Sequence, residues 1–185
     1  MNLLCSYLRM PYQPPEPFDD QTVGGFMIVH RHRSRGKPPA TGNEQAMAVY
    51  GDQMQEYEVR LAAQRLFADH LRPGDPDDPA VTPWTDIDLD LTGATLIDFT
   101  LTQCRIRTAT FETATFLEHT DFTQTVFTGS ADFRLARFAD SNTIAYFQAT
   151  RFAETANFTA AAFPQSAAFA KACFDGPAYF AQARQ

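Results

Sequence analysis

The sequence predicts a mainly β protein, a β-solenoid that is preceded by a helical N-terminal appendage. In the stretch "ANFTAAAFPQSAAFAKACFDGPAYF", Ala156–Phe180, phenylalanines follow one another at alternating steps of five and six residues, and an alanine stands two places before each. A helix needs apolar spacings of three and four, and an ordinary strand alternates every two residues over a longer run. A chain that points one small and one large residue inward and then turns a corner fits a solenoid instead.

This repeat extends over the second half of the chain. The large apolar residue of each step, here called the centre, recurs at Leu91, Leu96, Leu101, Ile106, Phe111, Phe116, Phe122, Phe127, Phe133, Phe138, Phe147, Phe152, Phe158, Phe163, Phe169, Phe174 and Phe180. A small residue stands two places before most centres, at Ala94, Cys104, Ala109, Ala114, Thr120, Thr125, Ala131, Ala136, Ala145, Ala156, Ala161, Ala167, Ala172 and Ala178. We therefore expect Phe133, Phe158 and Phe169 to be buried and stacked. The nine-residue step after Phe138 keeps the phase of the repeat and predicts a loop inserted in one coil.

The first part of the chain, residues 1–82, has a different composition and predicts an irregular and helical region. Residues 43–71 read as a helix, and "RPGDPDDPAVTP", residues 72–83, reads as a proline-rich linker before the β-solenoid at 84–185. On the helix, the polar residues Glu56, Arg60 and Gln64 take one face. The expected apolar face consists of Met54, Val59, Ala62, Ala63, Leu66 and Phe67. Within the preceding loop, "FMIV" is expected to form a short strand.

The net charge, the cysteines and the N-terminal stretch exclude several classes of protein. The net charge of −7 disfavours general nucleic-acid binding, which needs a basic surface. The three cysteines are far apart and form no CxxC motif, which favours a cytoplasmic protein without disulfides. The stretch "MNLLCSYLRMPYQPP" is too short and too polar for a membrane segment, and it lacks the pattern of a signal peptide.

The repeat resembles that of the pentapeptide repeat proteins, in which a small residue is followed by Leu or Phe and two free positions. "GATLID", "ATFET", "ADFRL" and "ANFTA" match that pattern, and the resemblance covers residues 86–185. It implies a right-handed quadrilateral β-helix with four repeats per coil. "LCSYLRMPY", "EVRLAAQRLFADHLRP" and "PWTDIDLDLTGATLIDFTL" also resemble the N-terminal helical part and the start of the β-helix in an actinobacterial subgroup of that family.

One basic cluster stands out, "HRHRSRGK", residues 30–37. Its cations Arg31, Arg33, Arg35 and Lys37 are interpreted as a solvated loop, with a contact to acidic protein, lipid headgroups or nucleic acid as the alternative. No carboxylate or cysteine stands near His30 and His32 in the sequence to complete a metal site, so neither a metal nor another cofactor is expected. Because no phosphate loop, nucleophile elbow or HExxH motif is present either, we expect no enzyme.

The leading functional hypothesis is a rigid scaffold that binds another protein. Outward positions near the C-terminal end are unusually apolar, and the candidates for an interaction surface, including a homodimer contact, are Ala162, Pro164, Ala168, Ala170, Tyr179 and Phe180. The resemblance also implies an alternative, a DNA mimic that protects a type II topoisomerase such as gyrase. Residues 86–185 hold eleven acids and seven bases, which is too balanced for such a mimic. A third hypothesis, a small-molecule enzyme, requires a concave polar pocket where the helix meets the solenoid.

Overall fold

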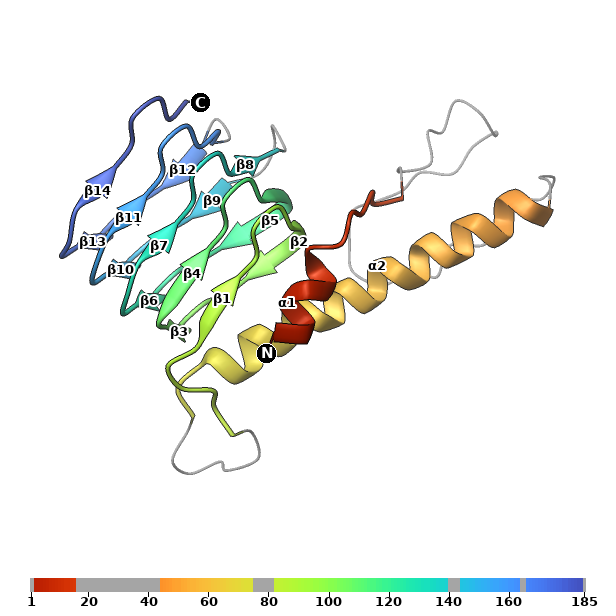
Figure 1. The fold of residues 1–185 in the computed structure, drawn as a ribbon, viewed down its shortest axis with the longest axis horizontal. Coiled ribbons are helices and arrows are strands. Elements are labelled where there is room, and N and C mark those ends of the chain that lie inside the picture. Colours follow the sequence, from red (N-terminus) through yellow and green to blue (C-terminus); the bar gives the residue numbers. More distant parts are fainter. Residues whose placement is uncertain (1, 16–43, 75–81, 140–143, 164–165, 185) are drawn as a thin grey trace. The chain divides into compact units, whose positions relative to one another are not determined.

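The computed structural model describes residues 2–15, 44–74, 82–139, 144–163 and 166–184. In these residues the chain forms helices α1 (Asn2–Leu8) and α2 (Glu44–Leu71), followed by fourteen short strands (Figure 1). It divides into two compact units, Met1–Tyr12 with Arg60–Gln185, and Gln13–Val59. The predicted fold class is confirmed, because the strands build a parallel β-solenoid of about four turns. The expected strand "FMIV" and the expected loop at 140–143 lie outside the described residues.

The coils of the solenoid have four faces, which the chain visits in order. The first face consists of β1 (Asp88–Asp90), β4 (Thr108–Thr110), β7 (Ala131–Asp132), β11 (Ala156–Asn157) and β14 (Ala178–Tyr179). The second and third faces share the long strands β2 (Thr95–Thr100) and β5 (Thr115–Asp121); β8 (Arg137–Phe138) completes the second face, and β9 (Ile144–Tyr146) and β12 (Ser166–Ala168) complete the third. The fourth face consists of β3 (Arg105–Ile106), β6 (Val126–Phe127), β10 (Arg151–Phe152) and β13 (Cys173–Phe174).

Tight turns explain the five-residue steps of the repeat. After each centre on the first and third faces, the backbone N–H three residues on donates to the carbonyl of the centre, as Ala136 does to Phe133 at 3.1 Å. The residue before that donor has a positive φ, for example Leu135 at 57°. These features define a type II turn, which normally places glycine at this position. Only Gly93 follows that preference among these turns, so the turns cannot be recognised in the sequence from a glycine pattern.

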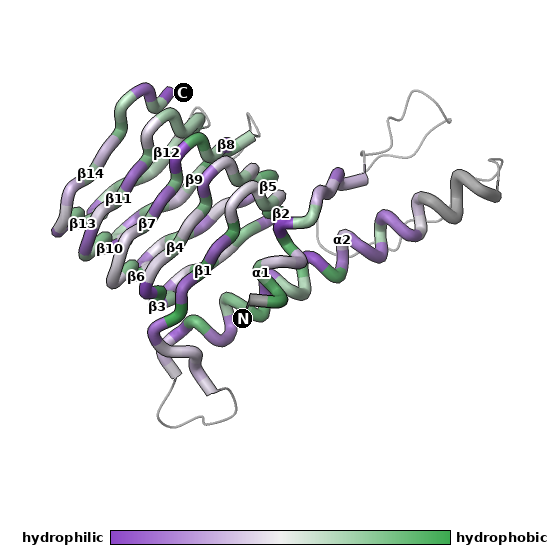
Figure 2. The backbone as a smooth tube through the Cα atoms, viewed as in Figure 1, coloured by the Kyte–Doolittle hydropathy of each residue, from purple (hydrophilic) through white to green (hydrophobic). Residues whose placement is uncertain are grey.

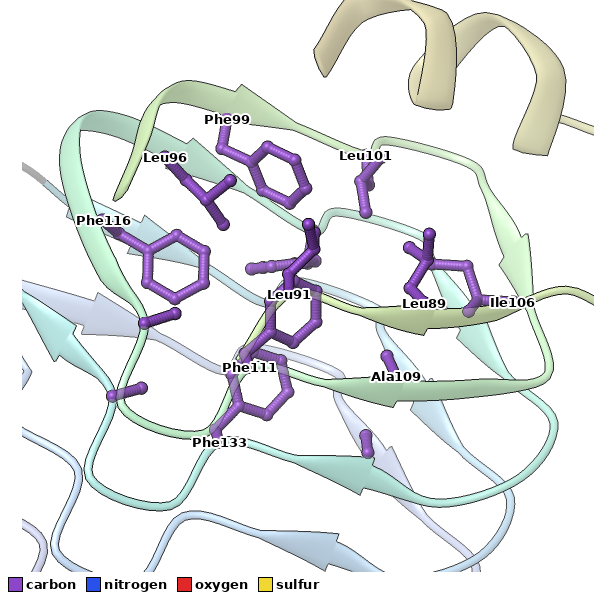
Figure 3. Close-up of a cluster of buried hydrophobic side chains, with 14 of the residues drawn as sticks. Leu89, Leu91, Leu96, Phe99, Leu101, Ile106, Ala109, Phe111, Phe116 and Phe133 are labelled. Atoms are coloured by element: carbon purple, nitrogen blue, oxygen red, sulfur yellow. The ribbon is translucent and has the colours of Figure 1, made fainter. Parts of the chain in front are cut away.

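The centres form four columns in the interior. Parallel pairing of the strands places each centre directly above the centre of the coil before it, so that Phe127 is in register with Phe152, and Phe152 with Phe174. Figure 3 shows leucine and phenylalanine side chains of the first coils pointing into this interior. Hydrophobic and hydrophilic residues alternate along the coils because every inward residue has outward neighbours (Figure 2).

The stacking predicted for three phenylalanines is confirmed, but in two columns. Phe133 and Phe158 are fully buried and stack with ring centroids 4.8 Å apart. Phe169 belongs to the neighbouring column, where it stacks on Phe147 at 4.7 Å. It is only partly buried, which corrects the expectation of full burial, because it lies in the last described coil.

The faces expected for helix α2 are confirmed only in part: Ala63 and Phe67 are buried as expected, but two residues of the expected polar face are buried with them. Val59 and Leu66 are 46 % and 41 % exposed, whereas Arg60 and Gln64 are buried beside Phe67. The Arg60 guanidinium donates hydrogen bonds to the carbonyls of residues 8 and 10, which end α1 and the turn after it. Long-range partners therefore make burial of a charged side chain favourable, and they hold α1 against the C-terminal half of α2.

The first coil is closed by side chains that the repeat pattern did not predict. Phe99 is fully buried in a position that later coils fill with Thr120 and Ala145. The Gln64 side chain donates to the carbonyl of Ile97 and accepts from its N–H, both at 2.9 Å. The amide of Gln64 thus satisfies the backbone of β2 much as a neighbouring strand does.

Candidate protein-interaction surface

The last described coil ends in a layer of aromatic rings. This terminal layer consists of Phe163, Phe169, Phe174 and Phe180, and each ring stacks on a ring of the coil before it at a centroid distance of 4.7–5.2 Å. The rings underneath are almost completely buried, whereas Phe180 is 42 % exposed and the other three are partly buried. In the part of the chain that the structure describes, this terminal layer is therefore apolar and more exposed than the layer underneath.

The backbone at this end is also free on one side. Strand β14 pairs only with β11, β13 only with β10, and β12 only with β9 among the described strands. Each therefore presents one edge whose N–H and C=O groups face away from the solenoid. Such edges favour pairing with another polypeptide.

The residues proposed from the sequence as interaction candidates surround this end but do not form one flat patch. Tyr179 lies on the first face and is 50 % exposed, and Ala162 lies on the second face between Arg137 and Arg184. Ala168 belongs to β12 on the third face, and Ala170 is exposed just beyond it. The candidates therefore encircle the last coil and border the terminal layer. Arg31, Arg33, Arg35 and Lys37, together with Pro164, lie outside the described residues.

Most of the outward aspartates stabilise the solenoid itself. The carboxylates of Asp90, Asp121 and Asp132 accept hydrogen bonds from the backbone N–H two residues later, at 3.1, 2.7 and 3.0 Å. Asn157 does the same at 3.0 Å. These Asx turns hold the chain where it leaves a face, so they give the acids a structural role.

Arginines form ion pairs with several outward carboxylates. Arg107 donates from Nε to Asp88 at 2.8 Å, and its hydrogen bond lowers the pKa of that carboxyl to about 2. Arg134 contacts both Asp132 and Glu112, and Arg151 contacts Asp175 at 2.6 Å. Acids and bases thus form local pairs along the faces. The described faces present mixed charge, without the unbroken acidic surface of a nucleic-acid duplex.

Two of the three cysteines lie in the solenoid and the third lies in helix α1. Cys104 is buried at an inward small position, and burial raises the pKa of its thiol to about 12. Cys173 is exposed on β13, and its hydrogen bond to Asp175 raises the pKa of its thiol. Cys5 is buried in α1. All three are free thiols.

One shallow pocket lies between the C-terminal half of α2 and β2, with a volume of about 200 Å³. Its lining residues are Leu61, Gln64, Arg65, Ala68, Asp69, Arg72, Asp98 and Thr100. It is smaller than the pockets of about 300–1,000 Å³ that usually hold small-molecule ligands. The pocket that an enzyme hypothesis requires at this junction is therefore present, but it is small.

Metal-binding and membrane-spanning features are absent from the part of the chain that the structure describes. No group of three or more His, Cys, Asp or Glu side chains in it is arranged to hold a metal ion. The helices seen there are too short or too polar to cross a bilayer. His30 and His32 lie outside these residues.

Sequence reasoning expected unpaired backbone at the last coil, but it missed the Asx turns and the pocket. An Asx turn has a recognisable signal, an Asp or Asn directly before a centre, whereas the pocket depends on how α2 packs on β2. Comparisons of the chain with protein-family models, with curated proteins and with solved structures find no match.

Proposed function

We propose that the protein is a non-enzymatic scaffold that binds protein through the terminal layer, and that a second copy of the chain is one such partner. The carrying observation is the apolar end, where Phe180 and Tyr179 are about half exposed beside free strand edges. Burying such rings contributes about 1.5–3 kcal/mol per side chain. The local pairing of acids and bases supports this proposal over a DNA mimic.

A closed homodimer fits this end better than a chain of copies. The opposite end of the solenoid is covered, because α1 and the C-terminal half of α2 pack against the first coil. Head-to-tail stacking needs both ends, whereas a two-fold dimer uses the same surface of each copy. We also propose membership in the pentapeptide repeat proteins, supported by four inward centres per coil.

The test measures mass in solution by light scattering at micromolar concentration. We expect a dimer, and Tyr179→Asp is expected to give a monomer because it places a charge in a desolvated contact. Leu135→Asp is the matched control, since Leu135 is 51 % exposed, close to the 50 % of Tyr179, but lies on an earlier coil. Circular dichroism checks that each variant stays folded.

A monomeric parent protein contradicts the dimer but leaves the scaffold open to a different partner. Capture from the native host, comparing the parent with Tyr179→Asp, then decides: a protein retained by the parent and lost by the variant supports the scaffold, and identical captures refute it. A supercoiling assay with gyrase and a quinolone tests the DNA-mimic alternative, for which we expect no protection.

A further inference from the structure

The pocket between α2 and β2 is lined by side chains of both charges. Most aspartates of the described solenoid hold hydrogen bonds, among them Asp88, Asp90, Asp121 and Asp132. Asp98 lines the pocket, is exposed, and has no hydrogen-bond or ion-pair partner among the described residues. Its carboxylate is therefore free to bind a cation.

The backbone at Asp98 has a positive φ, as do the turn residues of the other coils. Its φ is 49°, in the left-handed region, and the register of β2 with β5 shifts between Ile97 and Phe99. The Gln64 amide fixes this bulge by its two hydrogen bonds to Ile97. The Asp98 side chain is thus held at a fixed place in the pocket lining.

The helix side of the pocket supplies the opposite charge. Arg72 is already engaged, by an ion pair to Asp69 at 3.8 Å and a hydrogen bond to the Thr102 carbonyl at 3.3 Å. Arg65 lines the same pocket, is exposed, and has no such partner among the described residues. One free guanidinium and one free carboxylate therefore border the same small space.

We propose that this pocket binds a small zwitterion of amino-acid size, with its carboxylate on Arg65 and its ammonium group on Asp98. A volume of about 200 Å³ lies below the usual range for drug-sized ligands, so we choose a ligand with few heavy atoms, such as alanine. A guanidinium binds a carboxylate in a bidentate manner, which gives orientation as well as affinity. This site is independent of the terminal layer and of the scaffold proposed above.

To test this, the full chain is labelled with nitrogen-15 and titrated with L-alanine at neutral pH. Binding is followed by NMR. We expect saturable shifts of the backbone signals of Asp98 and Thr100 at millimolar ligand. Acetate and methylammonium, which carry one charge each, are expected to bind at least about tenfold more weakly. Equal shifts from acetate alone, or no saturable shift with L-alanine, overturn the proposal.

Two variants test whether Asp98 and Arg65 bind the charged groups of the ligand. Asp98→Asn keeps the left-handed backbone, because asparagine tolerates this conformation, and Arg65→Gln keeps a helix-forming residue on α2. Each is expected to weaken L-alanine binding by about tenfold or more while the other signals stay in place. Arg105→Gln is the control, since Arg105 is exposed on the fourth face, away from the pocket lining, and unchanged affinity is expected. If Asp98→Asn and Arg65→Gln bind as well as the parent, the site is wrong.

Discussion

Phe133 and Phe158 lie face to face in neighbouring coils, with ring centroids 4.8 Å apart and planes inclined by only 8°. Both are fully buried. The same column continues at Phe111 on one side and Phe180 on the other, at 4.8 and 4.9 Å. Because each ring is held between two others, a gap in the middle of the column cannot close by movement of a single neighbour.

Phe158→Ala is therefore expected to destabilise the protein by about 3–5 kcal/mol, since the cavity is lined by stacked rings that strand pairing holds in place. Urea unfolding measures the loss. Phe180→Ala is the matched control in the same column, and its cost is expected to be smaller because Phe180 is partly exposed. A loss below about 1 kcal/mol for Phe158→Ala contradicts the assignment of the column.

Gly176 is the second position where the stack constrains the sequence. A Cβ added there comes within 2.6 Å of the Glu154 backbone, one coil below. The coils cannot separate locally without breaking their hydrogen bonds, so Gly176→Ala is expected to cost about 1–3 kcal/mol or more. Gly129→Ala, with 3.0 Å to the Arg107 carbonyl, is expected to cost less.

Gly51 provides the control for this series. It lies within α2, and nothing comes within 4 Å of an added Cβ. Gly51→Ala is expected to stabilise the helix by up to about 1 kcal/mol. Thermal and urea unfolding of the three variants should give the order Gly176→Ala, Gly129→Ala, Gly51→Ala from least to most stable. If Gly176→Ala is not the least stable of the three, the close approach at Gly176 is contradicted.

The sequence predicted the solenoid because its core is periodic. An inward pair repeats in every short side, so a single residue such as Phe133 is placed by its neighbours in the sequence. Phe99 shows the limit, because it fills an inward position that the pattern assigns to a small residue. That exception depends on its place in the first coil, where no earlier coil exists to stack on it.

The helix and the pocket could not be predicted in the same way. Arg60 is buried because carbonyls of residues 8 and 10 accept its hydrogen bonds, and these partners are about fifty residues away in the sequence. The free charges of Arg65 and Asp98 share a pocket only because α2 crosses β2. Periodicity carries no information about such contacts.

The left-handed turn positions lead to a stability prediction. Leu135 has φ 57° and is about half exposed, so its side chain contributes little to the core while its backbone is in an unfavourable region. Leu135→Gly is expected to leave stability unchanged or raise it by up to about 1 kcal/mol. The reverse change, Gly93→Ala at φ 67°, is expected to lower it by about 1 kcal/mol. If urea unfolding shows both changes to be destabilising, the turns are not of type II.

The thiols should differ sharply in reactivity. Cys104 is buried with a pKa of about 12, so it is expected to react with a disulfide reagent only after unfolding. Cys173 is exposed and should account for the fast reaction, which Cys173→Ser should remove. Asp175→Asn should speed the reaction at slightly alkaline pH, because it removes the negative charge that helps to raise the pKa of the Cys173 thiol. A fast reaction that survives Cys173→Ser contradicts the burial of the other two thiols.

Acid is expected to weaken the protein partly through Asp88. Its pKa is lowered from 3.8 to about 2 by the hydrogen bond from Arg107, so the folded state binds a proton less readily than the unfolded state. This contribution to stability is complete above pH 4 and is lost as the pH falls through about 2. Both side chains are about half exposed, which limits the contribution to less than about 1 kcal/mol.

Urea unfolding at pH 5 and near pH 2.5 tests this, with the parent, Asp88→Asn and Arg107→Gln. The parent should lose more stability between the two pH values than either variant, because each variant already lacks the ion pair. Glu154→Gln is the control, since Glu154 is exposed and forms no ion pair with the described residues, and it should follow the parent. If Asp88→Asn follows the parent as well, the Asp88–Arg107 pair contributes nothing to folding and other carboxylates cause the acid sensitivity.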